Sequence, residues 1–414
     1  MISWALWDWG SAAFNAVIVT FVFTVYLTDA VAADEESGSQ ALGVSLAIAG
    51  VFIALLAPVT GQRSDAGGRR KLWLAVHTGL VVACTAGLFF IRDDPSYLLP
   101  GLVLIAAGSV FFEIAEVNYN AMLVQVASKA TIGRVSGFGW GMGYFGGLIA
   151  LTIVLFAFVQ PDVGLFGVTS QDGLNIRAVA LLSALWFAVF ALPLLLVVPE
   201  APASGEARRR NFFAGYVVLG KRLRRMWRTE RRTLGFLIAS AVYRDGLAAI
   251  FTFGGVVAAG TFGFSATEVV IFAIAANLTA GAGAMVGGRL DDRFGPKIVI
   301  VTALLGLVLV GGALVVLPGK IAFWVCGLIL ATFVGPAQSS SRTFLARIVT
   351  PEREGEAFGL YATTGRAVSF LGPLAFSGSI ALFGTQRAGM AGIALVLLAG
   401  LVALLPIRPP DSIR

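Results

Sequence analysis

Two long apolar runs flank the stretch GQRSDAGGRRK (residues 61–71), and two others flank the stretch GRLDDRFGPK (residues 288–297). Both stretches carry the pattern G-x-x-x-D-x-x-G with basic residues around it, and they lie slightly more than half the chain apart. This spacing indicates two similar halves, each threading a bilayer. A duplicated bundle of membrane helices is typical of a transporter.

The composition indicates a membrane protein independently of the repeat. The chain of 414 residues is 57% hydrophobic and only 13% charged, whereas a soluble domain carries about 25% charged residues. The 50 glycines suit helices that pack closely in a membrane. The net charge of +7 is explained by topology, so we expect no nucleic-acid partner. A single histidine, His77, excludes a histidine cluster, and we expect no metal, no cofactor and no catalytic residue.

Because roughly 20 apolar residues cross a bilayer, the apolar runs predict twelve transmembrane helices. The predicted fold is therefore an all-α integral membrane protein with two six-helix bundles. The spans expected in the N-terminal bundle, residues 1–198, are 5–27, 41–60, 72–91, 98–122, 136–159 and 175–198. The spans expected in the C-terminal bundle, residues 234–414, are 234–259, 266–287, 298–317, 321–341, 356–384 and 388–407. We expect the two bundles to be related by a pseudo-twofold axis along the membrane normal.

A basic linker, residues 199–233, separates the two bundles and carries Arg208, Arg209 and Arg210. It is interpreted as a topology signal with an amphipathic stretch that rests on anionic headgroups, or alternatively as a regulatory docking site. Most of the 30 lysines and arginines fall on the side of the bilayer that holds both termini. Because positively charged flanks stay in the cytoplasm, both termini are predicted to be cytoplasmic. We expect a multi-pass monomer in the plasma (inner) membrane.

Polar residues occur within the first helix of each three-helix group, and we expect these spans 1, 4, 7 and 10 to line a central cavity. They are Asp8 and Asn15, Glu113, Glu116 and Asn120, Arg244 and Asp245, and Gln338. Ionisable side chains at membrane depth are costly and face a cavity or a partner. Glu113, Glu116 and Asn120 are spaced to share one helix face.

Two carboxylates on one face repel each other, and a carboxylate that keeps its proton near neutral pH is what proton coupling requires. Glu113, Glu116 and Asp8 are therefore the candidates for proton coupling. The alternative is that a glutamate only pairs with an arginine of a neighbouring helix. Asp8 also lies near the start of its span, where it could cap the helix instead.

The two arginines inside the spans indicate the charge of the substrate. Arg244 and Arg366 each lie about 10 residues into a span, which is roughly 15 Å deep at 1.5 Å per residue. Transporter substrates bind near that plane, and an arginine there can hold a carboxylate by two parallel hydrogen bonds. The alternative is a salt bridge with Asp245 or Glu116. The predicted substrate-binding residues are Asn15, Glu116, Asn120, Arg244, Arg366 and Gln338.

The repeated loops are interpreted as mechanical elements. Asp65 and Asp292 lie near the ends of spans 2 and 8, where a carboxylate can pair with an arginine and latch one side of the protein shut. Exposed ion pairs contribute about 0–1 kcal/mol each, so such a latch could break in every cycle. The alternative is a tight turn whose charges only set the topology. The predicted gating residues are Gly61, Asp65, Gly68, Arg69, Gly288, Asp292, Arg293 and Gly295.

The doubled loop resembles the signature loop of the major facilitator superfamily. Further stretches resemble one branch of it, the bacterial permeases related to the autophagy-associated vacuolar amino-acid effluxer of eukaryotes. They are WDWGSAAFN (residues 7–15), NYNA (118–121), RVSGFGWGMGYFGG (134–147), YRDG (243–246), SR (341–342) and FGLY (358–361). The resemblance covers nearly the whole chain.

The resemblance implies a secondary transporter that works by alternating access and exports amino acids or small peptides. The chain departs from the branch at Arg244, where a small polar residue is usual, and at Gly10, where an asparagine is usual. The added positive charge favours a zwitterionic or anionic solute over a neutral or cationic one. A drug or metabolite permease of another substrate class is the alternative, and a non-transporting receptor or scaffold is a remote one. A membrane enzyme is disfavoured because no catalytic motif is found.

Overall fold

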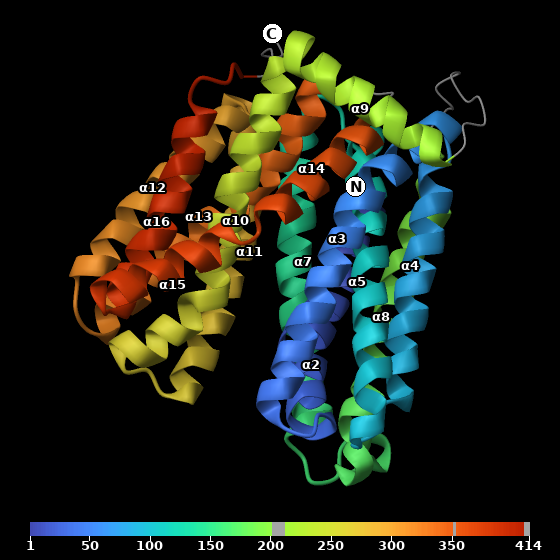
Figure 1. The fold of residues 1–414 in the computed structure, drawn as a ribbon, viewed down its shortest axis with the longest axis vertical. Helices are drawn as coiled ribbons and strands as arrows, with labels where there is room; N and C mark the ends of the chain where they lie inside the picture. The colour runs from blue at the N-terminus through green and yellow to red at the C-terminus, as the bar shows by residue number, and fades with distance from the viewer. Residues whose placement is uncertain (201–211, 351–352, 410–414) are drawn as a thin grey trace.

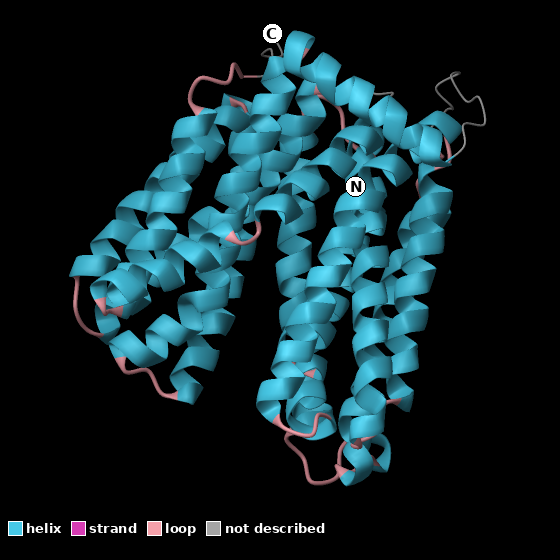
Figure 2. Ribbon diagram, in the orientation of Figure 1, coloured by secondary structure: helices cyan, strands magenta, loops and turns pink. Residues whose placement is uncertain are grey.

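The computed structural model describes residues 1–200, 212–350 and 353–409. Regular structure in these residues is helical (Figure 2). One isolated β-bridge joins Val163 and Thr169. Twelve helical segments within the described residues are long and apolar enough to cross a membrane. The prediction of an all-helical protein with twelve spans is confirmed.

The spans of the N-terminal bundle contain several short helical segments beside the long helices. Their elements are α1 (Ile2–Ala12), η1 (Ala13–Phe21), α2 (Phe23–Tyr26), η2 (Leu27–Val31), α3 (Glu35–Gly67), α4 (Arg70–Gly87), η3 (Leu88–Phe90), η4 (Pro95–Tyr97), α5 (Leu98–Ala121), α6 (Leu123–Val126), α7 (Ile132–Val154), η5 (Leu155–Val159), η6 (Leu165–Gly167), η7 (Gln171–Gly173) and α8 (Leu174–Val197). The first span was predicted over residues 5–27. It extends over Ile2–Val31 and contains the π-helical segments η1 and η2.

The C-terminal bundle follows the helix that occupies the linker, α9 (Phe212–Thr229). Its elements are α10 (Arg231–Phe262), α11 (Ala266–Phe294), α12 (Pro296–Val316), α13 (Lys320–Ile348), α14 (Glu354–Val368), α15 (Leu371–Phe383) and α16 (Gln386–Leu404). Arg208, Arg209 and Arg210 of the predicted basic linker lie outside the described residues.

Glycines with a positive φ angle end the helices at the signature loops. Gly68 at the end of α3 has φ +59°, and Gly295 between α11 and α12 has φ +86°. Glycine adopts this left-handed region without the steric cost of a side chain. Pro296 then occupies the first turn of α12, where its missing N–H is not needed. The glycines of the repeat thus set the tight turns that the motif predicts.

Span 11 was expected to be one helix, but it is broken between α14 and α15. Pro373 lies in the first turn of α15 and has no N–H to donate to the preceding turn. The N–H of Gly372 is also taken out of the helical pattern, because it donates to the Asp245 carboxylate of α10 at 2.5 Å. Asp245 therefore caps α15 and stabilises the break through the positive end of the helix dipole.

The two bundles converge at the end that holds both termini and α9, and they diverge toward the opposite end (Figure 1). We call the converged end the termini side. Most of the contact between the bundles is made by two helix pairs, α3 with α14 and α7 with α11.

Small residues allow these two pairs to pack backbone to backbone. A Cβ added at Gly61 of α3 would lie 2.1 Å from the Gly355 carbonyl oxygen of α14. A Cβ added at Gly137 of α7 would lie 2.3 Å from the carbonyl oxygen of Ala284 in α11. Such close approach is characteristic of glycine-rich helix pairs in membranes. The glycine content noted in the sequence is therefore concentrated, in part, where the bundles meet.

Candidate functional site

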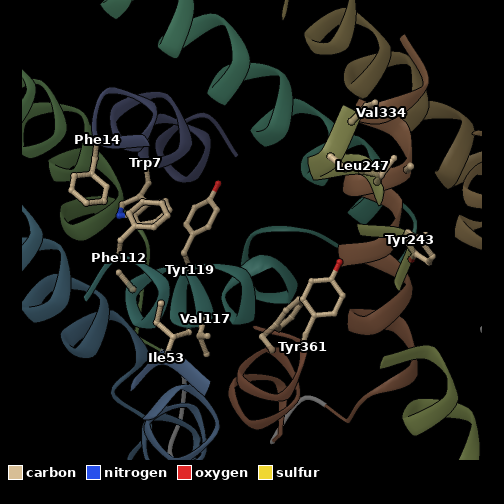
Figure 3. Close-up of a cluster of buried hydrophobic side chains, with 14 of the residues drawn as sticks. Trp7, Phe14, Ile53, Phe112, Val117, Tyr119, Tyr243, Leu247, Val334 and Tyr361 are labelled. Atoms are coloured by element: carbon tan, nitrogen blue, oxygen red, sulfur yellow. The ribbon is translucent and has the colours of Figure 1, made fainter. Parts of the chain in front are cut away.

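A cluster of polar and aromatic side chains lies where the two bundles meet. We call it the central cluster, and it consists of Asp8, Glu113, Glu116, Tyr119, Asn120, Arg244, Arg342, Tyr361 and Arg366. Its members come from α1, α5, α10, α13 and α14. Figure 3 shows Tyr119 beside the aromatic residues Trp7, Phe14 and Phe112, with Tyr361 and Tyr243 of the other bundle across from them.

Glu113 and Arg366 form an ion pair that joins the two bundles. The Arg366 guanidinium of α14 donates to the Glu113 carboxylate of α5. The Arg366 side chain is 42% exposed and that of Glu113 is 18% exposed. The sequence left open the alternative that a glutamate pairs with an arginine of a neighbouring helix, and Glu113 forms such a pair with Arg366. It also places a positive and a negative group side by side at a partly open position.

Arg244 pairs with neither of the carboxylates proposed for it. Its guanidinium lies 3.7 Å from the centroid of the Tyr361 ring and donates to the Tyr361 carbonyl oxygen at 3.2 Å. Stacking of this kind is a cation–π contact. Glu116, one turn from Glu113, interacts electrostatically with Arg244, Asp8 and Arg342. Arg244 therefore keeps guanidinium donors that no carboxylate occupies among the described contacts.

Arg342 is a central residue that the sequence reasoning missed. Span 10 was expected to end at residue 341, but α13 continues to Ile348, which places Arg342 inside the helix and leaves it only 3% exposed. Its Nη1 lies 3.6 Å from the Asp8 carboxylate and donates to the Asn120 side chain at 3.0 Å. The sequence did contain a signal for Arg342, because the pair Ser341-Arg342 is one of the stretches that carry the family resemblance.

The structure gives the surroundings of four further predicted residues. Asp8 lies inside α1 and accepts a hydrogen bond from the Tyr119 hydroxyl at 2.7 Å, so it does not cap the helix. Asn120 accepts from Arg342. Asn15 has an exposed side chain on η1. Gln338 has a buried Oε1 that has no hydrogen-bond partner among the described residues.

The first signature loop binds the opposite bundle. The Asp65 carboxylate accepts from the backbone N–H groups of Gly355 at 3.0 Å and Glu356 at 2.9 Å, in the first turn of α14. Arg70 bridges Asp65 at 2.7 Å and Glu354 at 2.6 Å. A carboxylate at a helix N-terminus is stabilised by the unpaired N–H groups and by the helix dipole.

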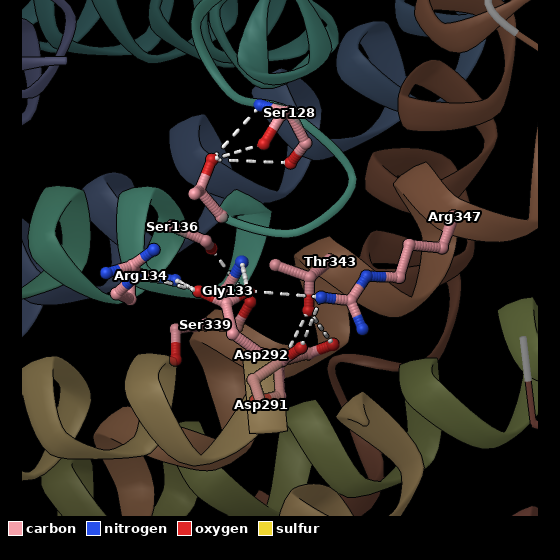
Figure 4. Close-up of polar contacts among 11 residues, drawn as sticks. Ser128, Gly133, Arg134, Ser136, Asp291, Asp292, Ser339, Thr343 and Arg347 are labelled. Atoms are coloured by element: carbon pink, nitrogen blue, oxygen red, sulfur yellow. Dashed lines mark hydrogen bonds and ion pairs between the residues drawn. The ribbon is translucent and has the colours of Figure 1, made fainter. Parts of the chain in front are cut away.

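The second signature loop repeats this arrangement in the other bundle (Figure 4). Asp292 accepts from the N–H groups of Gly133 at 2.7 Å and Arg134 at 2.9 Å, in the first turn of α7. Arg347 of α13 lies 3.2 Å from Asp292 and 3.0 Å from Asp291. Each signature aspartate therefore caps a helix of the bundle to which it does not belong.

The structure adds three details to the predicted latch, for which the pairing arginines were not named. Arg70 forms the ion pairs of the first loop, while Arg69 is exposed. Arg293 is also exposed and contacts the ring of its neighbour Phe294. The first pair is not an exposed one, because the Asp65 and Arg70 side chains are each 5% exposed. Removing one partner of a buried pair typically costs about 3–5 kcal/mol. This loss of stability is larger than the one expected at an exposed ion pair.

A family model described as "Vacuole effluxer Atg22 like" matches residues 37–413. The chain belongs to this family. The transporter is 26% identical to "Uncharacterized MFS-type transporter YxiO" of Bacillus subtilis over 97% of this chain and 93% of that protein. It is 25% identical to "Autophagy-related protein 22" of Cryptococcus neoformans over 76% of this chain, but it covers only 58% of that fungal protein.

Two solved structures share the fold of this Atg22-like protein. The proton:xylose symporter XylE bound to 6-bromo-6-deoxy-D-glucose matches with a TM-score of 0.75 at 14% identity, over 99% of this chain and 94% of that chain. The transporter FucP in its outward conformation matches with a TM-score of 0.74 at 13% identity, over 98% of this chain and 97% of that chain. At these identities the likeness establishes the fold alone.

The predicted family resemblance and the predicted fold class are thus confirmed. The protein is a multi-pass membrane protein of the major facilitator superfamily, a secondary transporter of a small molecule and not an enzyme. The repeated loop predicted this superfamily correctly.

Proposed function

We propose that this transporter moves a zwitterionic or anionic small solute, such as an amino acid or a short peptide, by proton-coupled alternating access. The observation that carries the proposal is the Glu113–Arg366 ion pair, which joins the two bundles at a partly exposed position. A zwitterion presents the same two charges as this pair. Its carboxylate can take the place of Glu113 on the guanidinium, and its ammonium can take the place of Arg366 on the carboxylate.

This exchange explains how binding can drive a conformational change. The pair joins α5 to α14 directly, whereas a bound zwitterion inserts between the two helices and separates the groups. Because the charges remain compensated, neither side chain is left as an unpaired charge in a low-dielectric site. Arg244, one helix away on α10, supplies a further guanidinium for an anionic group. Because no carboxylate contacts Arg244 among the described contacts, this residue suits a substrate that carries net negative charge.

Alternating access is supported by the way in which the bundles meet. The close glycine contacts and both signature aspartates lie on the termini side, which is therefore closed in this conformation. Opening that side requires Asp65 and Asp292 to leave the helices that they cap. We propose that the closed side faces the cytoplasm, with both termini there, that residues 1–198 and 234–414 act as two rigid bundles, and that the membrane is the plasma membrane.

Proton coupling rests on the carboxylates Asp8, Glu113 and Glu116 in the central cluster. Protonation of one of them changes the charge balance beside Arg342 and Arg366. The name of the matching family, an effluxer, favours export. The departure of Arg244 from the family pattern favours a solute with a negative group over a neutral one.

Transport in proteoliposomes tests the proposal. Purified protein is screened by thermal shift against L-amino acids, dipeptides, organic acids and drugs, because a ligand at 100 times its dissociation constant stabilises by about 2.7 kcal/mol. The zwitterion with the largest shift is then assayed for uptake driven by an imposed pH gradient. Stabilisation and transport only by apolar drugs would support the permease of another substrate class. No transport of any ligand would support the receptor alternative.

A further inference from the structure

Arg342 reaches across the interface between the bundles and binds groups of the other bundle. It belongs to α13 of the C-terminal bundle. Its Nε donates to the Ser136 hydroxyl at 2.9 Å and its Nη2 donates to the Ser136 carbonyl at 2.8 Å. Its Nη1 donates to Asn120 at 3.0 Å and faces Asp8 at 3.6 Å.

Aromatic rings complete this site. The guanidinium carbon lies 4.9 Å from the Trp4 ring centroid and 5.8 Å from those of Tyr119 and Trp140. Trp4 and Tyr119 are stacked on each other at 4.3 Å. The rings thus surround a desolvated cation, where cation–π contacts are strongest. All the contacts of Arg342 named here belong to α1, α5 and α7, so the termini side cannot open while the guanidinium stays in place.

Asp8 is the carboxylate that compensates this buried cation. Of the other titratable groups, Glu116 of α5 interacts electrostatically with both Asp8 and Arg342, and the Tyr119 hydroxyl of α5 donates to Asp8 at 2.7 Å. The groups of α7 found against the pair are Gly139, Trp140 and the Ser136 hydroxyl, and these are uncharged. The Asp8 side chain is 18% exposed and that of Arg342 is 4% exposed. The carboxylate is therefore the more exposed group of the pair.

We infer that Arg342 is the positioning residue that links the charge of Asp8 to closure of the termini side. Ionised Asp8 holds the guanidinium in the site of the opposite bundle and keeps that side closed. When Asp8 takes up a proton, the ion pair is lost, the buried cation is less well compensated, and withdrawal of Arg342 becomes easier. The inference rests on the proposed proton-coupled alternating access, and it assigns a coupling role to a residue that need not touch the substrate.

The test measures the opening of the termini side against pH without any substrate. Spin labels are attached to cysteines at Lys129 and Arg289, which are exposed and belong to different bundles, in a variant whose native cysteines are replaced by alanine. When the otherwise unchanged protein is acidified, we expect the ratio of open molecules, with the longer label distance, to closed molecules to rise at least tenfold. In Arg342→Gln the distance no longer depends on pH, although Asp8 is intact. Arg342→Lys keeps part of the dependence, because its charge remains but the planar fork does not.

Arg387 provides the matched control. It also donates to carbonyl oxygens and stacks on a ring, but its partners Leu314, Val315, Leu317 and Phe262 belong to its own bundle. Arg387→Gln should leave the pH dependence unchanged. If Arg342→Gln folds poorly, the double variant Asp8→Asn with Arg342→Gln removes both charges and is measured in its place, with the same expected loss of pH dependence.

Two results would overturn the inference. The first is a pH-dependent distance in Arg342→Gln, or in the double variant, that matches that of the unchanged protein. The second is a distance in the unchanged protein that does not respond to pH. Gradient-driven transport measured on the same samples separates this failure from failure of the proposed function. If transport remains proton-driven while the label distances contradict the role inferred for Arg342, proton coupling is retained and another residue carries it.

Discussion

Substitution of Gly61 by alanine should open the termini side. The added methyl carbon would lie 2.1 Å from the Gly355 carbonyl oxygen and 2.6 Å from its carbonyl carbon. Ordinary van der Waals contact begins at 3.4 Å. Both obstacles are backbone atoms, which cannot rotate away as a flexible side chain can. The helices α3 and α14 must therefore separate by roughly 1 Å or more to restore contact distances.

The magnitude follows from the cost of overpacking. Forcing an extra methyl group into a closely packed contact costs about 1–3 kcal/mol. This cost applies only to the closed conformation, because the two helices are apart when the termini side is open. The ratio of closed to open molecules should therefore fall by about 5–150-fold. Separation also lengthens the hydrogen bond of 3.0 Å from Gly355 N–H to Asp65, which adds to the effect.

Gly50→Ala is the matched control because Gly50 lies in the same helix and has no atom within 4 Å of the position of an added Cβ. Both substitutions improve helix propensity by about 1 kcal/mol, so that contribution cancels in the comparison. The assay is the distance between labels at Lys129, in the turn before α7, and Arg289 of α11. Because neither label is on α3 or α14, the distance reports movement of whole bundles. Equal distance distributions for Gly61→Ala, Gly50→Ala and the unchanged protein would refute the reasoning.

Three further predictions concern the charged groups. Arg366→Ala should raise the apparent dissociation constant of a zwitterionic ligand by ~10²-fold or more, and Arg366→Lys should recover part of the loss, as measured by calorimetry. Asp65→Ala should destabilise the closed state by about 3 kcal/mol and lengthen the label distance, whereas Arg69→Ala should not. Asp245→Ala should lower the free energy of unfolding by about 1–3 kcal/mol, because a buried N–H loses its acceptor, while Asp245→Asn keeps an acceptor and most of the stability in thermal denaturation.

The sequence predicted well the features that depend on local composition. Apolar length predicts the twelve spans, and the repeated glycine and aspartate pattern predicts turns at Gly68 and Gly295. The break in span 11 also had a local signal, the Gly372-Pro373 pair inside an apolar run. It was overlooked because the run remains long enough to cross a bilayer without a break.

The features that it did not predict depend on which helices face each other. Nothing local distinguishes Arg69 from Arg70, because the turn at Gly68 decides which one points at Asp65. The partners of Arg244 and Arg366 lie more than 100 residues away along the chain. Arg342 was placed outside its span because charged residues were taken to end the apolar run. A buried arginine held by aromatic rings, uncharged polar groups and a carboxylate of another bundle has no sequence pattern of its own.

The central claim is that Glu113 and Arg366 exchange their mutual contact for the two charges of a zwitterion. The most direct measurement is calorimetric binding of the zwitterion selected by thermal shift to the double variant Glu113→Gln with Arg366→Gln. This variant removes both charges together, so no unpaired charge is left buried and the fold should persist, which its melting temperature checks. We predict that affinity falls by ~10²-fold or more, as expected when charged hydrogen-bond partners are lost. Binding with unchanged affinity would reduce the pair to a structural contact between the bundles and contradict the account.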